Sequence, residues 1–409
     1  MFEEATFTDD LMATHVIEDP YSYYADLRQN DPIHWNPEFG GWIVTRHSDV
    51  VSAFRRPEHF SSAVAALDTG IPYPPISELD ATADADARAF LADLMLEMDP
   101  PEHSELRDSL RLWFTPKRIE DWRATIREDV SRILNTLVGR KAMEVKEELA
   151  TPIPLLFICR MLSIPESDAP YVHGLANTIA AARSTEPNRL QEVVSAYESF
   201  RAYFAPIIDE RSATPGDDLV SMLIDAHSRG ICTESQMYAN LALLVLAGHD
   251  TTVRLVSSGT LLFLNNPEQW DLLRSDPAAF ARTATEECLR CEPPVKSLWR
   301  IATVDTELGG REIAAGDRLL LVMAAANRDP EVFVDPDTFD ITRAKNPHVT
   351  FAIGIHHCLG AALARLEGQE VFRALAETFP RLRLAPGESI TWLPRPFSRQ
   401  LQSLNVCWD

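Results

Sequence analysis

The 409-residue sequence is 45% hydrophobic and 24% charged, which is typical of a globular protein with a large core and excludes a disordered chain. Its 38 basic and 61 acidic residues give a net charge of −23, which argues against nucleic acid or an anionic membrane as the main partner. Neither a signal-like start nor a run of roughly 18 apolar residues occurs, so we expect a cytoplasmic protein without a membrane span.

Helical periodicity dominates the chain. The segments 189–212 and 267–291 repeat apolar residues every three or four positions, whereas strand-like runs such as 40–45 and 317–325 are the minority. No Pro-rich or Ser/Gly-rich linker divides the chain, so we expect a single domain over residues 1–409. The predicted fold class is mainly α with a smaller β region.

One predicted helix is unusually long. Thr233 and Gln236 form a capping-box pattern, and no helix breaker other than glycine follows until Pro267, so about 30 residues can be helical over roughly 45 Å. The middle of this segment is apolar nearly all round, which indicates a buried helix. A polar cluster, AGHDTT at 247–252, interrupts it.

Cys358, in FAIGIHHCLG (351–360), has four candidate roles: a buried hydrophobe, half of a disulfide, a zinc ligand, or a thiolate held against another cofactor. Six sparse, irregular cysteines exclude a disulfide framework, and the CLRC pair at 288–291 lacks the second ligand pair that a structural zinc site needs. A helical pattern follows the cysteine, and the helix N-terminus favours a thiolate. Taken alone, an inert buried cysteine is still the commoner case.

Each of two charged pairs could be an ordinary surface pair instead of a functional one. Glu287 and Arg290 lie three residues apart on one helical face and would ordinarily form a solvated pair. His103 and Arg107 lie four apart after a double proline; they are either exposed or a clamp for a dianionic ligand. Arg300 lies in a strand-like stretch that follows the Glu287–Arg290 pair in the sequence.

Together these motifs make the chain similar to the soluble bacterial cytochromes P450. FAIGIHHCLG fits the haem-thiolate signature F-x-x-G-x-H-x-C-x-G, AGHDTT fits the oxygen-binding segment of the long helix, and Glu287-x-x-Arg290 fits the ion pair of the family. The segment 325–343 fits the meander before the cysteine loop, and DPPEH at 99–103 and FSRQLQSLNV at 397–406 fit in the expected order. The resemblance covers nearly the whole chain and implies a cytochrome P450 fold with the long central helix over the haem.

The resemblance also implies the residues that bind haem b. It makes Cys358 the axial thiolate ligand of the iron, with the electron donation that favours O–O cleavage. The remaining implied cofactor-binding residues are His103, Arg107, Arg300 and His356 at the propionates, Phe351 and Gly360 in the cysteine loop, and Ala247 and Gly248 beside dioxygen. His357 matches no ligand position.

Residues 247–252 carry the predicted oxygen chemistry. The Thr251 hydroxyl can bond the Ala247 carbonyl and open the helix beside Gly248, which leaves room for dioxygen. We assign Asp250, as a buried carboxylate beside that hydroxyl, to proton relay from water, and Thr251 to holding the oxygen ligand. His249 either modulates this relay or faces a groove between helices. Two other departures from the family pattern are Ala352, where glycine is common, and Cys291, where an aromatic residue is common.

The implied activity is that of a monooxygenase inserting one atom of O₂ into a hydrophobic or amphipathic small molecule, most simply by hydroxylation and with a place in secondary metabolism. Electrons from NAD(P)H would arrive through a separate ferredoxin and ferredoxin reductase, docking near Arg107, Arg111 and Arg365. A peroxide-using peroxygenase and a non-catalytic haem-thiolate sensor are the alternatives. By resemblance, the substrate pocket comprises 65–79, 177–184, Leu243, Ala247, 296–298, Pro396 and Phe397.

Overall fold

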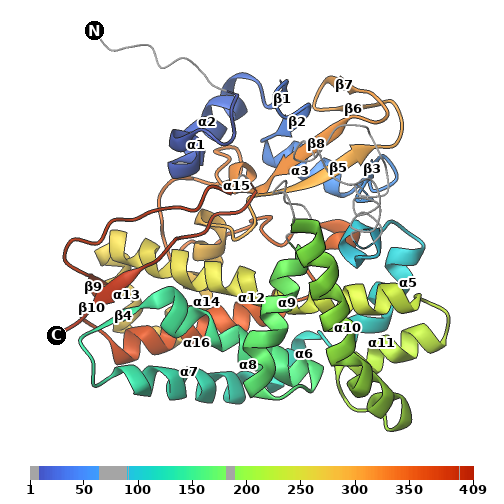
Figure 1. Ribbon diagram of the computed structural model, residues 1–409. Coiled ribbons are helices and arrows are strands. Elements are labelled where there is room, and N and C mark those ends of the chain that lie inside the picture. The colour runs from blue at the N-terminus through green and yellow to red at the C-terminus, as the bar shows by residue number, and fades with distance from the viewer. Residues whose placement is uncertain (1–8, 64–89, 91, 181–188, 396) are drawn as a thin grey trace.

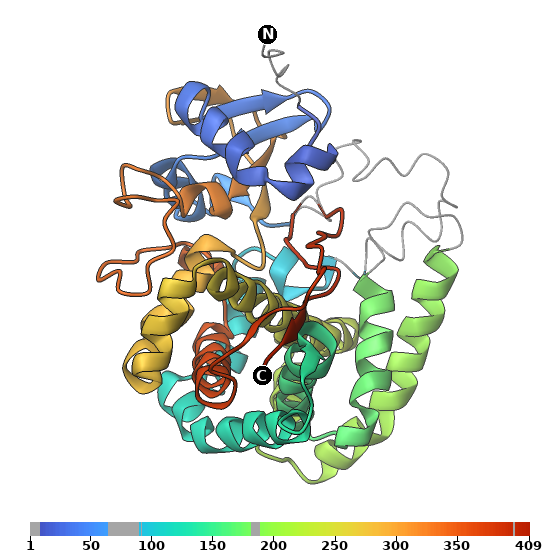
Figure 2. The same cartoon turned by 90° about the vertical axis from the view of Figure 1, so that its left-hand side faces the viewer.

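A large helical region and a smaller region of strands and short helices make up the chain (Figure 1 and Figure 2). The computed structural model describes residues 9–63, 90, 92–180, 189–395 and 397–409. The arrangement confirms the prediction of a mainly α protein with a smaller β region. Within the described ranges, no helix combines the length and apolar character needed to cross a bilayer.

The smaller region is built on a five-stranded sheet in the order β1-β2-β8-β5-β3. Its strands are β1 (Ile33–Asn36), β2 (Gly41–Val44), β3 (Phe60–Ser61), β5 (Ser297–Ala302) and β8 (Arg318–Val322). β2 and β8 pair in parallel, and the other neighbours pair antiparallel. The sheet therefore joins the beginning of the chain to residues 297–322. The short helices of this smaller region are α1 (Thr14–Glu18), α2 (Pro20–Asn30), α3 (His47–Phe54) and α15 (Met323–Ala326).

Two smaller sheets complete the strands. A three-stranded sheet has the order β4-β10-β9, and β6 pairs antiparallel with β7 as a hairpin. Their bounds are β4 (Ala142–Glu144), β9 (Arg383–Leu384), β10 (Asn405–Cys407), β6 (Thr306–Leu308) and β7 (Arg311–Ile313). The three-stranded sheet fixes the C-terminal strand beside residues 142–144.

The helical region surrounds the long helix α12 (Glu234–Asn265), which has 32 residues and spans about 48 Å at about 1.5 Å per residue. The predicted capping box is present: Gln236 N–H donates to Thr233 Oγ1 over 3.1 Å, and Thr233 N–H donates to Gln236 Oε1 over 2.9 Å. Both bonds satisfy backbone or side-chain groups that a free helix end would leave to water. The sequence therefore predicted the start of α12 from its chemistry.

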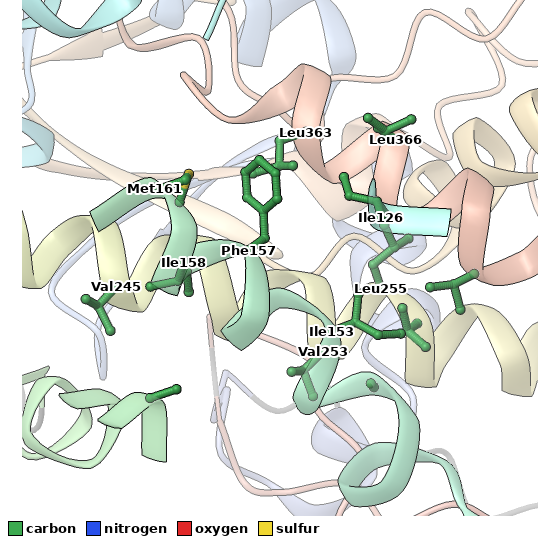
Figure 3. Packing of buried hydrophobic residues seen from close by; sticks show 14 of the residues in the cluster. Ile126, Ile153, Phe157, Ile158, Met161, Val245, Val253, Leu255, Leu363 and Leu366 are labelled. Atoms are coloured by element: carbon green, nitrogen blue, oxygen red, sulfur yellow. The ribbon is translucent and has the colours of Figure 1, made fainter. Parts of the chain in front are cut away.

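The other helices pack around α12. They are α5 (Glu102–Arg111), α6 (Pro116–Asp121), α7 (Arg123–Leu137), α8 (Pro152–Leu162), α9 (Ala169–Ala180), α10 (Arg189–Ala213), α11 (Leu219–Ser228), α13 (Pro267–Ser275), α14 (Pro277–Cys291) and α16 (Ala361–Thr378). Figure 3 shows how Ile126 of α7, Phe157 of α8, Leu255 of α12 and Leu366 of α16 meet in one apolar core. This core fixes α12 between α8 and α16, which carry two walls of the site.

Two segments that the sequence pattern predicted as one helix and one strand each form two elements in the structure. The helical pattern 267–291 forms two helices, because Pro277 starts α14 and Asp276 caps it by accepting a bond from Ala279 N–H over 3.0 Å. The strand-like run 317–325 is a strand only to Val322, after which α15 begins. Both boundaries depend on local capping and packing that apolar periodicity does not report.

Candidate functional site

An apolar cavity of about 300 Å³ lies between α12, α5 and the segment around Cys358. Of the residues proposed for the site from sequence, nine line this cavity: His103, Arg107, Ala247, Gly248, Thr251, Phe351, His356, Cys358 and Gly360. Asp250 and Arg300 are not among the lining residues that the structure describes. Residues far apart in the sequence therefore meet around one cavity.

The cysteine loop presents Cys358 to the cavity just before α16. Cys358 N–H donates to the Phe351 carbonyl over 2.8 Å, which closes the loop from 351 to 358. The surface that Cys358 exposes lies within the cavity rather than on the outside of the protein. Burial raises the pKa of the Cys358 thiol, and this effect outweighs the opposing Gly360 N–H and the Arg107 and Arg365 charges. The Gly360 N–H at the start of α16 thus lowers the pKa as the prediction expects, but burial of the cysteine without a bound iron has the larger effect.

Two residues of this loop have left-handed backbone conformations. Ala352 has φ of 55°, and Gly354 has φ of 77°. A Cβ on Gly354 would lie 2.7 Å from the Phe54 carbonyl oxygen of α3, so this position requires glycine for space as well as conformation. Ala352 is buried and holds a conformation that disfavours a side chain by about 1–2 kcal/mol. The surrounding packing, and not local preference, keeps the loop in this shape.

A cluster of basic groups lies at one side of the cavity. The rings of His103 and His356 are 4.0 Å apart, and Arg107 donates to the His357 carbonyl. Burial first, and then the neighbouring arginines, lowers the pKa of His103 to about 4 and that of His356 to about 2. The mutual repulsion of these groups is relieved by an anion.

Two ring nitrogens of this cluster are free to bind a ligand. His103 Nδ1 and His356 Nε2 are buried and have no hydrogen-bond partner. Arg300 is buried and is not among the described residues that line the cavity. Burial lowers its pKa to about 10, and its charge lowers the pKa of both histidines. Buried polar atoms without partners are uncommon in folded proteins. Two carboxylates carried on an apolar planar group would satisfy them, so the residues fit a haem with its propionates here.

On the α12 wall, the Thr251 hydroxyl donates to the Ala247 carbonyl over 2.9 Å. This is the bond expected from the four-residue spacing, and it forms while α12 remains an unbroken helix through this segment. Ala247, Gly248 and Thr251 all face the cavity. A polar notch thus lies in an otherwise apolar wall.

The neighbouring hydroxyl belongs to a pair that the sequence analysis missed. Thr252 Oγ1 donates to Glu367 Oε2 over 2.9 Å, and Glu367 Oε1 is buried without a partner. Burial raises the pKa of Glu367 to about 8, against the smaller lowering effect of the Thr252 bond. A signal was available: Glu367 lies four residues from both Leu363 and Val371, so the helical spacing places it on a buried face.

Asp250 points away from the cavity, toward α9. Its carboxylate lies 3.0 Å from His249 Nδ1, 3.4 Å from His173 Nε2 and 3.3 Å from an Arg254 guanidinium nitrogen. The pKa of Asp250 is lowered because these three bases outweigh its desolvation, although burial is the largest single influence and raises it. The expectation of a buried carboxylate beside the Thr251 hydroxyl is corrected: Asp250 is 34% exposed and bound to other partners.

The Glu287–Arg290 pair is a buried structural element. Both side chains are 0% exposed, and Arg290 Nε and a terminal nitrogen donate to the two Glu287 oxygens over 2.9 and 2.7 Å. Arg290 also donates to the carbonyls of Asn327 and Thr338, and Arg343 donates to Glu287 over 3.2 Å. The alternative of a solvated surface pair is excluded, because both side chains are buried. The network also ties α14 to the segment before the cysteine loop.

The predicted substrate and partner residues are only partly placed. Leu243, Ala247 and Leu298 line the cavity, whereas Lys296 is buried elsewhere and burial lowers its pKa to about 8. The segments 65–79 and 181–184 and residue Pro396 lie outside the described residues. Arg111 is 61% exposed and pairs with Asp108, while Arg365 is held by Glu286 at 2.7 Å.

Comparison with known proteins agrees with this geometry. The family model described as cytochrome P450 matches residues 279–396. The "Biotin biosynthesis cytochrome P450" of Bacillus subtilis is 33% identical over 99% of this chain and 100% of its own length. The "Polyketide biosynthesis cytochrome P450 PksS" of the same species is 34% identical over 95% of each chain.

Solved structures show the same fold. The crystal structure of CalO2 matches with a TM-score of 0.89 at 29% identity, covering 98% of both chains. The structure of P450BioI in complex with an acyl carrier protein ligated by hexadec-9Z-enoic acid matches with a TM-score of 0.87 at 32% identity, covering 97% of this chain and 99% of that one. The similarity therefore extends over the cavity and over both walls that form it.

Proposed function

The chain belongs to the cytochrome P450 family, and we propose that its cavity binds a hydrophobic or amphipathic small molecule for hydroxylation. A member of this family is a haem-thiolate monooxygenase that uses haem b, O₂ and electrons from NAD(P)H supplied by redox partners. The observation that carries the proposal is that Cys358 and the Thr251–Ala247 notch line the same apolar cavity.

Within that cavity, this chain's residues divide the work of holding the cofactor. Cys358 would ligate the iron, and the thiolate ligand supplies the electron density that favours O–O cleavage when haem is bound. His103, Arg107, Arg300 and His356 would neutralise the propionates, as their unsatisfied atoms and mutual repulsion support. Phe351 and Gly360 shape the loop around the sulfur.

The α12 wall would control oxygen and protons. Ala247 and Gly248 leave space beside the notch, and Thr251 offers a hydroxyl that can donate there. Asp250, partly exposed and adjacent in sequence, would accept protons from solvent and pass them toward Thr251. Its three basic partners must release the carboxylate for this transfer, so the relay depends on a change of its rotamer.

We also propose a separate ferredoxin and ferredoxin reductase as the redox partners, and a cytoplasmic location. The exposed Arg111 of α5 lies four residues from Arg107, whose bond to the His357 carbonyl connects α5 to the cysteine loop. Charge reversal by Arg111→Glu is expected to slow ferredoxin-driven turnover and weaken its salt dependence. The matched control is Arg383→Glu in β9, a strand that Figure 1 shows on the opposite side of the molecule from α5; equal effects of the two changes would contradict this docking surface.

The substrate class follows from the cavity lining. Leu243, Leu244 and Leu298 line it together with Met95 and Phe114. Apolar walls with few polar groups suit a ligand with a hydrophobic body. A titration of the haem-loaded protein with fatty acids, terpenoids and polyketide-like compounds, read as a shift of the Soret band, tests this class; shifts given only by small charged compounds would contradict it.

The first experiment tests the thiolate ligand. The dithionite-reduced protein with carbon monoxide is expected to show a strongly red-shifted Soret band that is lost in Cys358→Ser. Absence of the band from folded, haem-loaded parent protein would show that Cys358 does not bind the iron.

A second experiment tests the notch. Thr251→Ala is expected to divert reducing equivalents from product to hydrogen peroxide while substrate binding persists, because the hydroxyl at the notch is removed. Product formed per NAD(P)H consumed is the measurement. An unchanged ratio in the variant would refute the assigned role of Thr251.

A further inference from the structure

A second cluster of possible metal ligands lies off the haem cavity, between α9 and α12. His173 comes from α9, and His249 and Asp250 come from α12. One ligand atom from each lies within 4.8 Å of the other two, and the two imidazole rings are 3.8 Å apart. None of the three is among the described residues that line the haem cavity.

The hydrogen bonds around His249 do not balance for a neutral ring. Its Nε2 lies 3.2 Å from the Thr151 carbonyl, and its Nδ1 lies 3.0 Å from Asp250 Oδ1. Both oxygens are acceptors, but a neutral imidazole has only one N–H. Whichever nitrogen carries the proton, the other directs a lone pair at an oxygen.

Either an extra proton or a cation resolves this conflict. An extra proton would place a positive charge on a ring that is 3% exposed, with Arg254 already beside the same carboxylate. A metal ion between His249 Nδ1 and Asp250 Oδ1 resolves it with Nε2–H donating to Thr151. That is the arrangement in which metal-binding histidines are oriented by a backbone carbonyl.

Two of the three separations between ligand atoms are close to those around a small tetrahedral ion, and the third is within 4.8 Å. His249 Nδ1 and His173 Nε2 lie 3.0 and 3.4 Å from Asp250 Oδ1. Ligands about 2.0–2.1 Å from a tetrahedral Zn²⁺ lie about 3.3 Å from one another. Arg254 binds Asp250 Oδ2, so Oδ1 stays available. The Asn177 amide nitrogen lies 3.3 Å from His173 Nδ1 and 3.2 Å from Nε2, so the Asn177 amide must turn its oxygen to Nδ1–H when Nε2 binds the ion.

We propose that His173, His249 and Asp250 form a binding site for Zn²⁺ or a similar divalent transition metal ion, linking α9 to α12. Two imidazoles and one carboxylate are ligands that such ions prefer. The partly exposed Asp250 leaves the fourth position to water. The ion would hold the Asp250 carboxylate and so oppose its use in proton transfer. This effect on proton transfer rests on the proposed function, whereas the binding of the ion does not.

The test uses untagged, haem-loaded protein dialysed against a chelator and then titrated with Zn²⁺ alone, with a chromophoric chelator as competitor. One zinc ion per haem is expected at micromolar free zinc. His173→Phe keeps a ring beside His249 but removes both nitrogens, and it should weaken zinc binding by more than the about 10- to 100-fold typical of losing an outer-shell partner. His15→Ala, which changes an exposed histidine of α1, is the matched control and should bind as the parent does.

A second readout is independent of ligand counting. Zinc should raise the unfolding midpoint of the parent and of His15→Ala but not that of His173→Phe, because an ion bound only to the folded state stabilises it. The carbon monoxide spectrum shows that each variant is folded and loaded. Parent protein that binds no stoichiometric zinc, or a His173→Phe variant that binds it as tightly, would overturn the site. No turnover is required, so this outcome is separate from that of the monooxygenase assignment.

Discussion

Two carboxyl groups next to adjacent threonines of α12 have opposite properties. Asp250 faces α9, contacts three bases and has a lowered pKa. Glu367 of α16 lies on the cavity wall, accepts one hydroxyl and has a pKa raised to about 8. Burial raises the pKa of both groups, so their partners decide the outcome. The comparison shows that one helix can separate a carboxylate whose partners lower its pKa, on the solvent side, from a carboxyl whose burial raises its pKa, beside the cofactor site.

The largest expected effect is the loss of a pH dependence in Glu367→Gln. A carboxyl with a folded-state pKa of about 8 and an ordinary value of 4.5 stabilises the fold at acid pH, and this contribution is lost as pH rises toward about 8. The slope reaches about 1.4 kcal/mol per pH unit. Glutamine does not titrate, so the stability of the variant relative to the parent should rise across this window.

The measurement is the difference in urea unfolding midpoint between haem-loaded parent and Glu367→Gln at several pH values. Exposed Glu268→Gln of α13 is the control, and its difference should stay flat. A flat difference for Glu367→Gln as well would show that Glu367 is ionised in the folded protein.

The second-largest expected effect distinguishes the roles of Asp250 and Glu367 in catalysis. Asp250→Asn should lower the rate of product formation by about 100-fold, within the range typical of general acid–base groups. Glu367→Gln should leave this rate close to that of the parent. Substrate-dependent oxygen uptake and product are measured together. The reverse result, with only Glu367→Gln impaired, would assign proton delivery to the cavity-side carboxyl and Thr252.

A smaller effect is expected from Thr252→Val, which keeps the side-chain shape and removes the only described donor to Glu367. The unfolding free energy should fall by about 1–3 kcal/mol, because a buried carboxyl loses its partner. Thr251→Val, next in sequence, is the matched comparison. Its hydroxyl bonds a carbonyl within its own helix, so a larger loss of stability there would contradict the importance of the Thr252–Glu367 bond.

The smallest effect concerns Asp250 and its outermost base. Without added zinc, His173→Phe should change the unfolding free energy by less than about 1 kcal/mol, because the pair is partly exposed and long at 3.4 Å. Equilibrium unfolding in urea measures this. A loss of several kcal/mol would mean that His173 carries an ionic interaction as strong as a buried one.

Sequence patterns predicted much of this molecule, for identifiable physical reasons. The capping chemistry of Thr233 and the apolar length after it predicted α12, and residue spacing predicted the Thr251–Ala247 bond, since both depend on local helix geometry. The partners of Asp250 and Glu367 were not predicted. His173 and Thr252 reach them through the packing of α9 and α16 on α12, which no spacing within one segment encodes.

The close approach of Gly354 to the Phe54 carbonyl has a consequence for biosynthesis. The cysteine loop packs against α3, which is made early, whereas the loop itself is made near the end of the chain. Contacts between segments so distant in sequence form slowly, because a long loop must close first. We therefore expect haem capture to follow synthesis of nearly the whole polypeptide. A ribosome-bound chain ending before residue 351 should remain colourless in the presence of haem.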